Sequence, residues 1–218
     1  MLVLVLDTAT PAVTAALAEL SPADGVALRA ERVTVDARAH GELLAPSIQA
    51  VIAEGGAAPR DLAAIVAGLG PGPFTGLRVG LVTAVAMAHT LGIPTYGVCT
   101  LDAFAHGTSG RLLVATDARR REVYWAEYAD GQRVAGPSVS APAAIETAAT
   151  NATGDGAVRY RDVLGLPVVG PQFPPAAALA ALAADRVLAK ATTEPLTPLY
   201  LRRPDAVEPV TRKRVSTG

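Results

Sequence analysis

The chain has 218 residues, of which 50% are hydrophobic and 18% are charged, so it can bury a sizeable core and is not of the disordered class. Its 19 basic and 20 acidic residues leave a formal net charge of -1, which excludes a general electrostatic attraction to nucleic acid or to an anionic membrane. The single cysteine, Cys99, excludes an internal disulfide and a thiolate metal cluster, as expected in a reducing compartment.

The first part of the chain predicts three antiparallel strands in succession. Apolar runs are interrupted by turn-forming residues and lie at residues 2–6, 12–17 and 26–35. The first run ends in Asp7 and has no positively charged segment before it, so we expect no export signal.

Helices and further strands then alternate. Apolar residues at helical spacing predict a helix that starts at His40 and stops at Gly55-Gly56. A strand, a helix that is apolar almost all round, another strand and a short helix are expected at residues 65–69, 77–91, 95–100 and 101–106. The longest apolar helical run, residues 81–88, is interrupted by Thr83 and is far shorter than the ~20 residues of a membrane span, so we expect none.

A second unit begins at Arg111 and opens as the first one does. An apolar strand again runs into an aspartate, Asp117, turns, and returns as a second strand at residues 122–128. Aligning Asp7 with Asp117 therefore predicts a structural duplication. After it we expect a strand from Gln132, a helix from Pro142 to about Ala149, a turn at residues 153–156 and an alanine-rich helix from Pro175 to Lys190.

Two lobes that each open on a strand ending in aspartate predict an α/β protein with the actin-like ATPase fold, the duplicated ribonuclease-H-like design with mixed sheets and crossover helices. The predicted lobes are residues 1–108 and 109–203, and residues 204–218 lack periodicity and predict a mobile tail. By fold-level analogy the two aspartate turns face a central cleft for a nucleotide. Candidates for a vestigial site there are Asp7, Thr8, Asp117, Gly154 and Asp155.

A glycine-proline loop, residues 68–76, joins the strand at 65–69 to the apolar helix. It first suggests a phosphate-binding loop, which aims backbone N–H groups at an anion beside a helix N-terminus. The Lys-Ser or Lys-Thr pair of a P-loop is missing, and Pro71 and Pro73 have no N–H to donate. We therefore interpret the loop as a stiff corner that positions the next helix.

The helix at 77–91 is too apolar for a solvated surface, so it is either enclosed by its own lobe or shared with a partner. Both alternatives stay open at this point. The candidate interface residues, taken from this helix and the one before it, are Leu44, Ile48, Val82, Val85 and Met87.

The residue types for catalysis or metal binding do not converge in the sequence. His40, His89 and His106 are scattered without metal-ligand spacing, and Cys99 lies in an apolar strand pattern, as a structural thiol would. We therefore name no catalytic and no metal-binding residue. The run Arg119-Arg120-Arg121 is either a solvated hairpin tip or a contact for phosphate or RNA.

Three segments resemble a known family. Residues 70–80, GPGPFTGLRVG, closely resemble the GPGSFTGLRIG signature of the TsaB (YeaZ) family. Residues 38–46, RAHGELLAP, and 117–125, DARRREVYW, resemble its RAHSELLLP helix start and its DARRGEVYW hairpin, and the resemblance extends over roughly residues 1–203. Pro73 and Gly41 stand where the family pattern usually has serine, so two hydroxyl groups are missing.

The resemblance implies a function in making threonylcarbamoyladenosine beside the anticodon of tRNA. It implies an essential but non-catalytic subunit, with a TsaD-type transferase and a TsaE-type ATPase as partners, tRNA reached through the complex, and self-dimerisation when the chain is alone. Metal and ATP would be used by the partner subunits, and no cofactor is expected in this chain. Thr100 and Phe104 stand where TsaD-type proteins carry metal-binding histidines, and neither side chain can replace an imidazole, which implies a pseudo-enzyme.

Three other hypotheses stay open on the sequence alone. A metallopeptidase-like enzyme of the same superfamily is one, and a nucleotide-dependent kinase, suggested by Asp7 and Asp117, is another. The third is a direct tRNA-binding module that uses Arg119–Arg121 and the basic tail. We expect a cytoplasmic location and no membrane contact.

Overall fold

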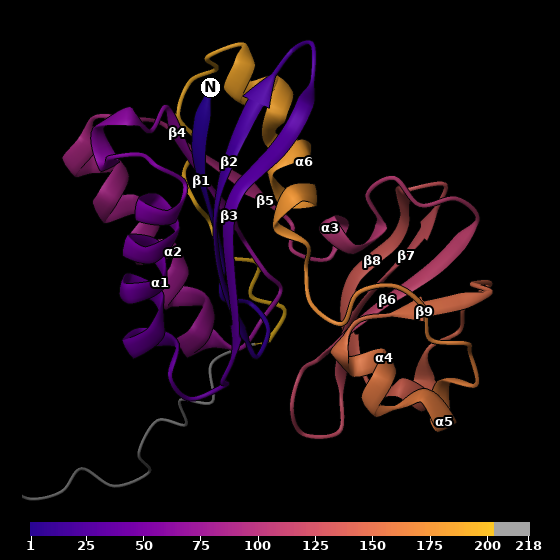
Figure 1. Cartoon of the computed structure of the whole chain (residues 1–218). Helices are drawn as coiled ribbons and strands as arrows, with labels where there is room; N and C mark the ends of the chain where they lie inside the picture. The colour runs from indigo at the N-terminus through magenta and orange to yellow at the C-terminus, as the bar shows by residue number, and fades with distance from the viewer. Residues whose placement is uncertain (203–218) are drawn as a thin grey trace, which may run out of the picture.

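The computed structural model describes residues 1–202, which form two lobes lying side by side (Figure 1). The expected mobile tail, residues 204–218, lies outside the described residues. The elements from the N-terminus to the lobe boundary are β1 (Leu2–Asp7), β2 (Ala12–Ser21), β3 (Gly25–Val35), α1 (His40–Glu54), η1 (Pro59–Asp61), β4 (Ala64–Gly68), α2 (Phe74–Leu91), β5 (Thr95–Val98) and α3 (Asp102–Ala105). The remaining elements are β6 (Arg111–Asp117), β7 (Val123–Ala129), β8 (Gln132–Ser140), η2 (Pro142–Ala144), β9 (Asn151–Thr153), α4 (Asp155–Arg159), α5 (Arg161–Leu164) and α6 (Ala176–Leu188).

Each lobe is built on a mixed sheet whose first three strands form an antiparallel meander. The first sheet has the strand order β3-β2-β1-β4-β5, with β4 parallel to β1 and β5 parallel to β4. The second sheet has the order β8-β7-β6-β9, with β9 parallel to β6. The predicted meander in both units is confirmed, and the second sheet is shorter by one parallel strand.

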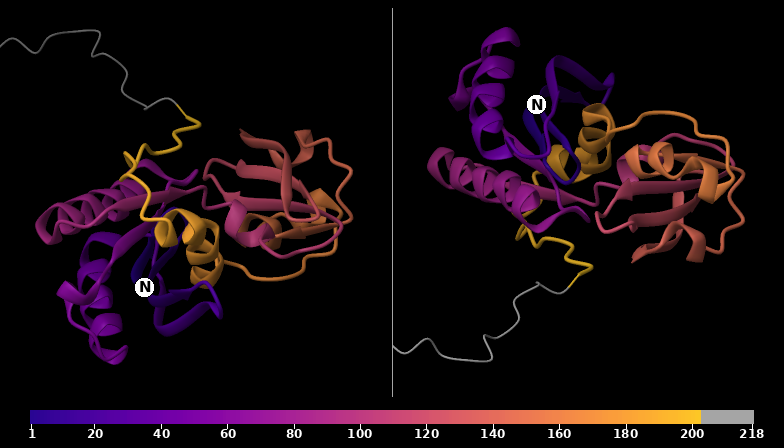
Figure 2. Two further views of the ribbon diagram at one scale, coloured as in Figure 1. Left: turned by 90° about the horizontal axis from the view of Figure 1, so that it is seen from above. Right: turned by 90° about the horizontal axis from the view of Figure 1, so that it is seen from below.

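Helices cover both faces of the first sheet. Helices α1 and α2 lie on one face, and α6 lies on the other, between the sheet and the second lobe (Figures 1 and 2). Successive side chains of a strand point to opposite faces, so Leu4 and Leu6 pack under α1 and α2 while Val3 and Val5 pack under α6. A strand covered on both faces must be apolar throughout, which explains the unbroken run that opens the chain.

Helix α6 differs from its predicted place. The sequence assigned residues 109–203 to the second lobe, but α6 packs on the first sheet, where Leu179 and Val187 join the cluster around Val66. Its many alanines allow the helix backbone to approach the sheet closely, and the face of β1 and β2 opposite α1 would otherwise stay uncovered. The second lobe therefore ends before α6.

The predicted helix from Pro142 to Ala149 is wrong. Only the short 3-10 turn η2 forms, and the chain then runs irregularly to β9. The Thr147 hydroxyl donates to the Glu127 carboxylate at 2.8 Å and accepts from the Ala149 N–H at 3.0 Å. Such side-chain bonds compete with helical ones, and here they hold the segment extended across the second sheet.

Two other boundaries also differ from expectation. The predicted turn at 153–156 is the end of β9 followed by the first residues of α4. Helix α2 begins at Phe74, three residues before the predicted start, and its 18 residues are long and apolar enough to cross a membrane by length and composition alone. In this fold one face of α2, with Leu77, Leu81 and Ala84, packs into the core under the first sheet.

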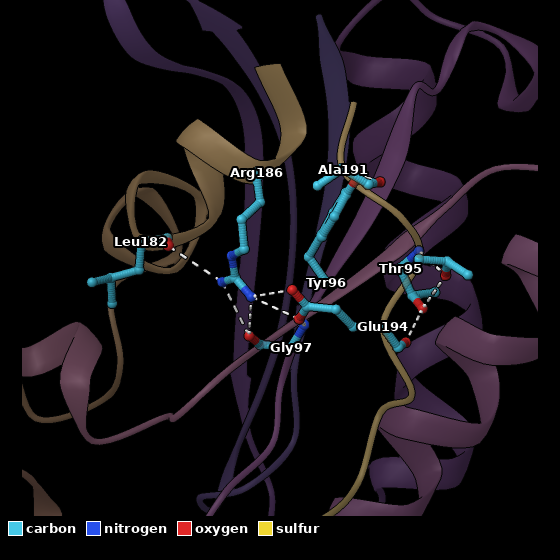
Figure 3. A network of polar contacts seen from close by, with 8 residues as sticks. Thr95, Tyr96, Gly97, Leu182, Arg186, Ala191 and Glu194 are labelled. Atoms are coloured by element: carbon cyan, nitrogen blue, oxygen red, sulfur yellow. Dashed lines mark hydrogen bonds and ion pairs between the residues drawn. The ribbon is translucent and has the colours of Figure 1, made fainter. Parts of the chain in front are cut away.

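A polar network fastens α6 to the sheet edge (Figure 3). The Arg186 guanidinium donates to the Gly97 carbonyl at 3.2 Å and pairs with the Glu194 carboxylate at 2.7 Å. The Tyr96 hydroxyl donates to the Ala191 carbonyl at 2.6 Å. These contacts fix both the end of α6 and the start of the segment after it on β5.

That segment, residues 193–202, forms a strap between the two lobes. The Glu194 N–H bonds to the Thr95 carbonyl at 3.0 Å, and the Leu199 N–H bonds to the Leu69 carbonyl at 2.8 Å. At its far end Arg202 donates to the Ala118 carbonyl at 2.8 Å and pairs with the Glu122 carboxylate. The strap thus joins the first sheet to the loop between β6 and β7.

The loop before α2 packs backbone against backbone on the turn after β1. A Cβ atom added at Gly72 would lie 2.3 Å from the Ala9 carbonyl oxygen, and one added at Gly68 would lie 1.7 Å from the Asp7 carboxylate. Only glycine fits at these distances. The prediction of a corner that positions α2 is confirmed in this contact.

We expect Gly72→Ala to destabilise the protein by about 2 kcal/mol, because the added methyl group forces the two backbone segments apart. Urea denaturation measures this change. The matched control is Gly41→Ala at an exposed position of α1 where nothing lies within 4 Å, which should stabilise the protein by roughly 0.5 kcal/mol. An unchanged urea midpoint for Gly72→Ala would contradict the assigned contact.

Candidate functional site

The aspartate turn of the first lobe is closed by its own hydrogen bonds. One carboxylate oxygen of Asp7 accepts from the Ala9 N–H at 2.9 Å, and the other accepts from the Thr100 hydroxyl at 2.6 Å. The Thr100 hydroxyl in turn accepts from the Gly70 N–H at 3.1 Å. Asp7 is buried, and both of its carboxylate oxygens are bound within the chain.

Burial raises the pKa of Asp7 from 3.8 to about 6, although the bonds from Thr100 and Ala9 and the nearby His40 act in the opposite direction. Desolvation disfavours the charged form of a carboxyl, and here that effect is the largest.

Thr8 fastens the same turn to α2. Its hydroxyl donates to the Gly76 carbonyl at 2.8 Å and accepts from the Gly80 N–H at 3.1 Å. Asp7 and Thr8 therefore hold the end of β1, the segment after β5 and α2 together at one corner.

The second-lobe candidates Asp117, Gly154 and Asp155 do come together. Asp155 accepts from the Asp117 N–H at 3.2 Å, and Asp117 pairs with Arg159 at 3.1 Å. Burial raises the pKa of Asp155 to about 6, with the neighbouring Asp117 charge adding to the increase. At Gly154, with φ of 100°, a Cβ atom would lie 2.3 Å from the Ala115 carbonyl oxygen. Asp117 at the end of β6 thus contacts the turn that Gly154 and Asp155 form between β9 and α4.

Two adjoining cavities of about 340 and 270 Å³ lie between the lobes and share Pro73, Phe74 and Arg119 in their walls. We call them together the inter-lobe cleft. Thr8 and Asp117 both line the smaller cavity, so the structure brings these two predicted residues to one site. The remaining ionisable and aromatic residues in the walls are His40, Arg120, Tyr124, Tyr200 and Arg202.

Within residues 1–202 no group of three or more His, Cys, Asp or Glu side chains could hold a metal ion. Thr100 donates to Asp7, and Phe104 packs in the cluster under β6, so both positions are core. Burial raises the pKa of the Cys99 thiol to about 11, which keeps it protonated at neutral pH.

The predicted interface residues divide between surface and core. Val82 and Val85 on α2 are 65% and 50% exposed. Leu44 on α1 is 1% exposed, so its assignment to a contact surface is wrong. Ile48 is 5% exposed but lines a groove between α1 and α2, so its assignment stays a prediction. Both pack in the core with Leu4 and Leu6, because the helical repeat of apolar residues marks the face turned toward the sheet.

Met87 is half-buried and lines a groove of about 460 Å³ between α1 and α2. The exposed α1 residues of this groove, Ala45, Gln49 and Ala53, were missed by the sequence analysis. Their i, i+4, i+8 spacing is a signal, but small and neutral side chains give it no hydrophobic contrast.

Pro73 occupies the N-cap of α2 without any side-chain cap, which is the position where a serine would cap the helix.

We expect Asp7→Asn to reduce the pH dependence of stability. The pKa of Asp7 is higher in the folded state, about 6 against 3.8, so the folded protein holds this proton more tightly and stability falls as pH rises through that interval. Between pH 4 and pH 7 this contribution is on the order of 3 kcal/mol, and the variant should lack it. Urea denaturation at four pH values measures the free energy of unfolding, and Asp24→Asn at an exposed position is the control. Equal slopes of this free energy against pH for Asp7→Asn and wild type would refute the prediction.

Comparison with known proteins assigns the fold and the family. A family model described as "TsaD: tRNA N6-adenosine threonylcarbamoyltransferase" matches residues 31–196. A Mycobacterium tuberculosis protein described as uncharacterized is 52% identical over 206 residues, which are 94% of this chain and 93% of that protein. The Escherichia coli tRNA threonylcarbamoyladenosine biosynthesis protein TsaB is 37% identical over 59% of this chain and 55% of its own length.

The structure of YeaZ from Pseudomonas aeruginosa superposes with a TM-score of 0.75 and 26% identity, over 92% of this chain and 99% of that one. This agreement confirms the actin-like, ribonuclease-H-like fold expected from the two aspartate turns. With a TsaD-type family model over most of the chain, TsaB relatives by sequence and YeaZ by structure, the chain belongs to the TsaB (YeaZ) family.

Proposed function

We propose that this chain is the non-catalytic subunit that binds and supports a TsaD-type transferase in tRNA threonylcarbamoyladenosine biosynthesis. The observation that carries the proposal is the outer face of α2, where Val82 and Val85 are 65% and 50% exposed on a helix whose inner face is core. Exposed apolar residues that gather in one patch are typical of protein interaction sites.

The groove beside this face supports a protein partner. None of its lining residues is charged, from Ala45 and Gln49 on α1 to Thr83 and Met87 on α2. A stable interface excludes charge from its centre and buries apolar side chains in such depressions. We expect the first-lobe helices to contact the transferase, and a second copy of this chain when the transferase is missing.

The site chemistry supports a non-catalytic role. Asp7 and Thr8 hold the corner under α2 through bonds within the chain, and Thr100 is bound to Asp7. The metallopeptidase-like and kinase hypotheses need these positions for a metal or a nucleotide. We therefore expect ATP and metal to be used by the partner transferase and a TsaE-type ATPase, in the cytoplasm.

Val85→Arg should abolish co-purification with the TsaD-type partner, because it places a charge at the centre of an apolar contact. A pull-down of the tagged partner from co-expressing cells measures the loss, expected to exceed tenfold. Val158→Arg, at a 45% exposed valine on α4 in the second lobe, is the matched control and should bind as wild type does. Equal capture of both variants would contradict a contact between the outer face of α2 and the transferase.

The chain should be required for modification of tRNA in a reconstituted reaction. With the TsaD-type transferase, the TsaE-type ATPase and the other proteins of the pathway, tRNA, threonine, bicarbonate and ATP present, omitting this chain should remove the modified nucleoside from the digest analysed by mass spectrometry. Full yield of the modified nucleoside without this chain would contradict the proposal, whatever the outcome of the pull-down.

A further inference from the structure

The inter-lobe cleft carries positive charge that the proposed function does not use. Its walls contain three arginines, Arg119, Arg120 and Arg202, against one aspartate, Asp117. Arg202 pairs with Glu122, and Asp117 pairs with Arg159. In the part of the chain that the structure describes, the Arg119 guanidinium has no carboxylate partner, so it is available to an anion.

The loop that carries these arginines is held in an unfavourable backbone conformation. Arg119, Arg120 and Arg121 have φ of 64°, 56° and 64°, the left-handed region, which costs non-glycine residues roughly 1–2 kcal/mol each. The loop is kept there by Asp117, which accepts from the Arg119 N–H at 3.2 Å, and by Arg202, which donates to the Ala118 carbonyl at 2.8 Å. Strain of this kind is concentrated at functional sites.

An aromatic wall stands beside the arginines. The rings of Phe74 and Tyr200 lie 4.9 Å apart between centroids and are 42% and 39% exposed at the residue level. Arg78 lies over the Phe74 ring at 4.1 Å from its centroid. Phe74 and Tyr200 line the larger cavity, of about 340 Å³, together with Arg119. One cavity therefore contains both a cationic guanidinium and flat aromatic rings.

We propose that the inter-lobe cleft binds an unpaired nucleotide segment of tRNA, with a phosphate beside Arg119 and a base against the Phe74–Tyr200 wall. Proteins that bind single-stranded nucleic acid combine a basic groove with aromatic side chains in this way. The net charge of -1 gives the whole chain no attraction for RNA, so the contact has to be local, as it is here. This inference rests on the proposed function, which supplies tRNA as the substrate of the complex.

The test measures tRNA binding by the complex of this chain with its TsaD-type partner. The probe is a fluorescent, unmodified transcript of a tRNA that the complex modifies, titrated by anisotropy at several KCl concentrations. Arg119→Ala should weaken binding about tenfold and lower the slope of log K against log salt by roughly 0.7, the value for one lost phosphate contact on a single strand. Arg119→Lys keeps the charge and should retain most of the affinity.

The matched control is Arg161→Ala on α5, since Arg161 is exposed in the same lobe and lies outside the cleft walls. Equal tRNA affinity for Arg119→Ala and Arg161→Ala overturns the inference. A free nucleotide also offers a phosphate and a base, and calorimetry with ATP distinguishes it from tRNA. If Arg119→Ala loses ATP binding while its tRNA binding is unchanged, the cleft binds a free nucleotide, which also overturns the inference.

The failures of the two proposals are distinguishable in the same preparations. If modification requires this chain but tRNA affinity does not change in Arg119→Ala, the subunit function is supported and only the RNA contact is contradicted. If modification reaches full yield without this chain, the subunit function is contradicted. A salt-dependent loss of tRNA affinity in Arg119→Ala would still support the RNA contact.

Discussion

The close approach of two backbone segments, the turn after β1 and the glycine loop before α2, sets the rest of the structure. Gly72 lies against Ala9 at a distance that admits no side chain, and the Thr8 hydroxyl bonds to α2 from the same turn. This contact fixes the direction in which α2 leaves the sheet. It also buries Asp7, whose two carboxylate oxygens are both bound within the chain, so the corner is held by polar contacts as well as by packing.

Much of the fold could be predicted because local pattern decides it. The strands β1, β2 and β4 are apolar on both faces, α2 follows a stiff corner, and each meander begins with a strand ending in aspartate. What failed depends on distant partners. Periodicity identifies α6 as a helix but not the sheet that it covers, and the irregular path after η2 depends on the bond between Thr147 and Glu127, which are 20 positions apart.

The site was predictable in part for the same reason. Thr8 and Asp117 were chosen by analogy between the two turns, and they do line one cavity. That Asp7 would be sealed by Thr100 could not be foreseen, because the bond joins residues 93 positions apart. On α1 the repeat that revealed the helix also marks its buried face, so Leu44 was assigned to a surface that it does not reach. The outward residues there are too small and neutral to be recognised.

The position of α6 has a consequence for how the protein is made. Residues of β1 and β5 that are synthesised early, such as Val5 and Tyr96, have their second apolar face covered by residues 176–188. A ribosome releases the chain from its N-terminus, so the first sheet stays half open until residues 176–188 have emerged. The first lobe therefore cannot finish folding as an independent unit during translation, and its exposed sheet face has to be kept from other chains until α6 arrives.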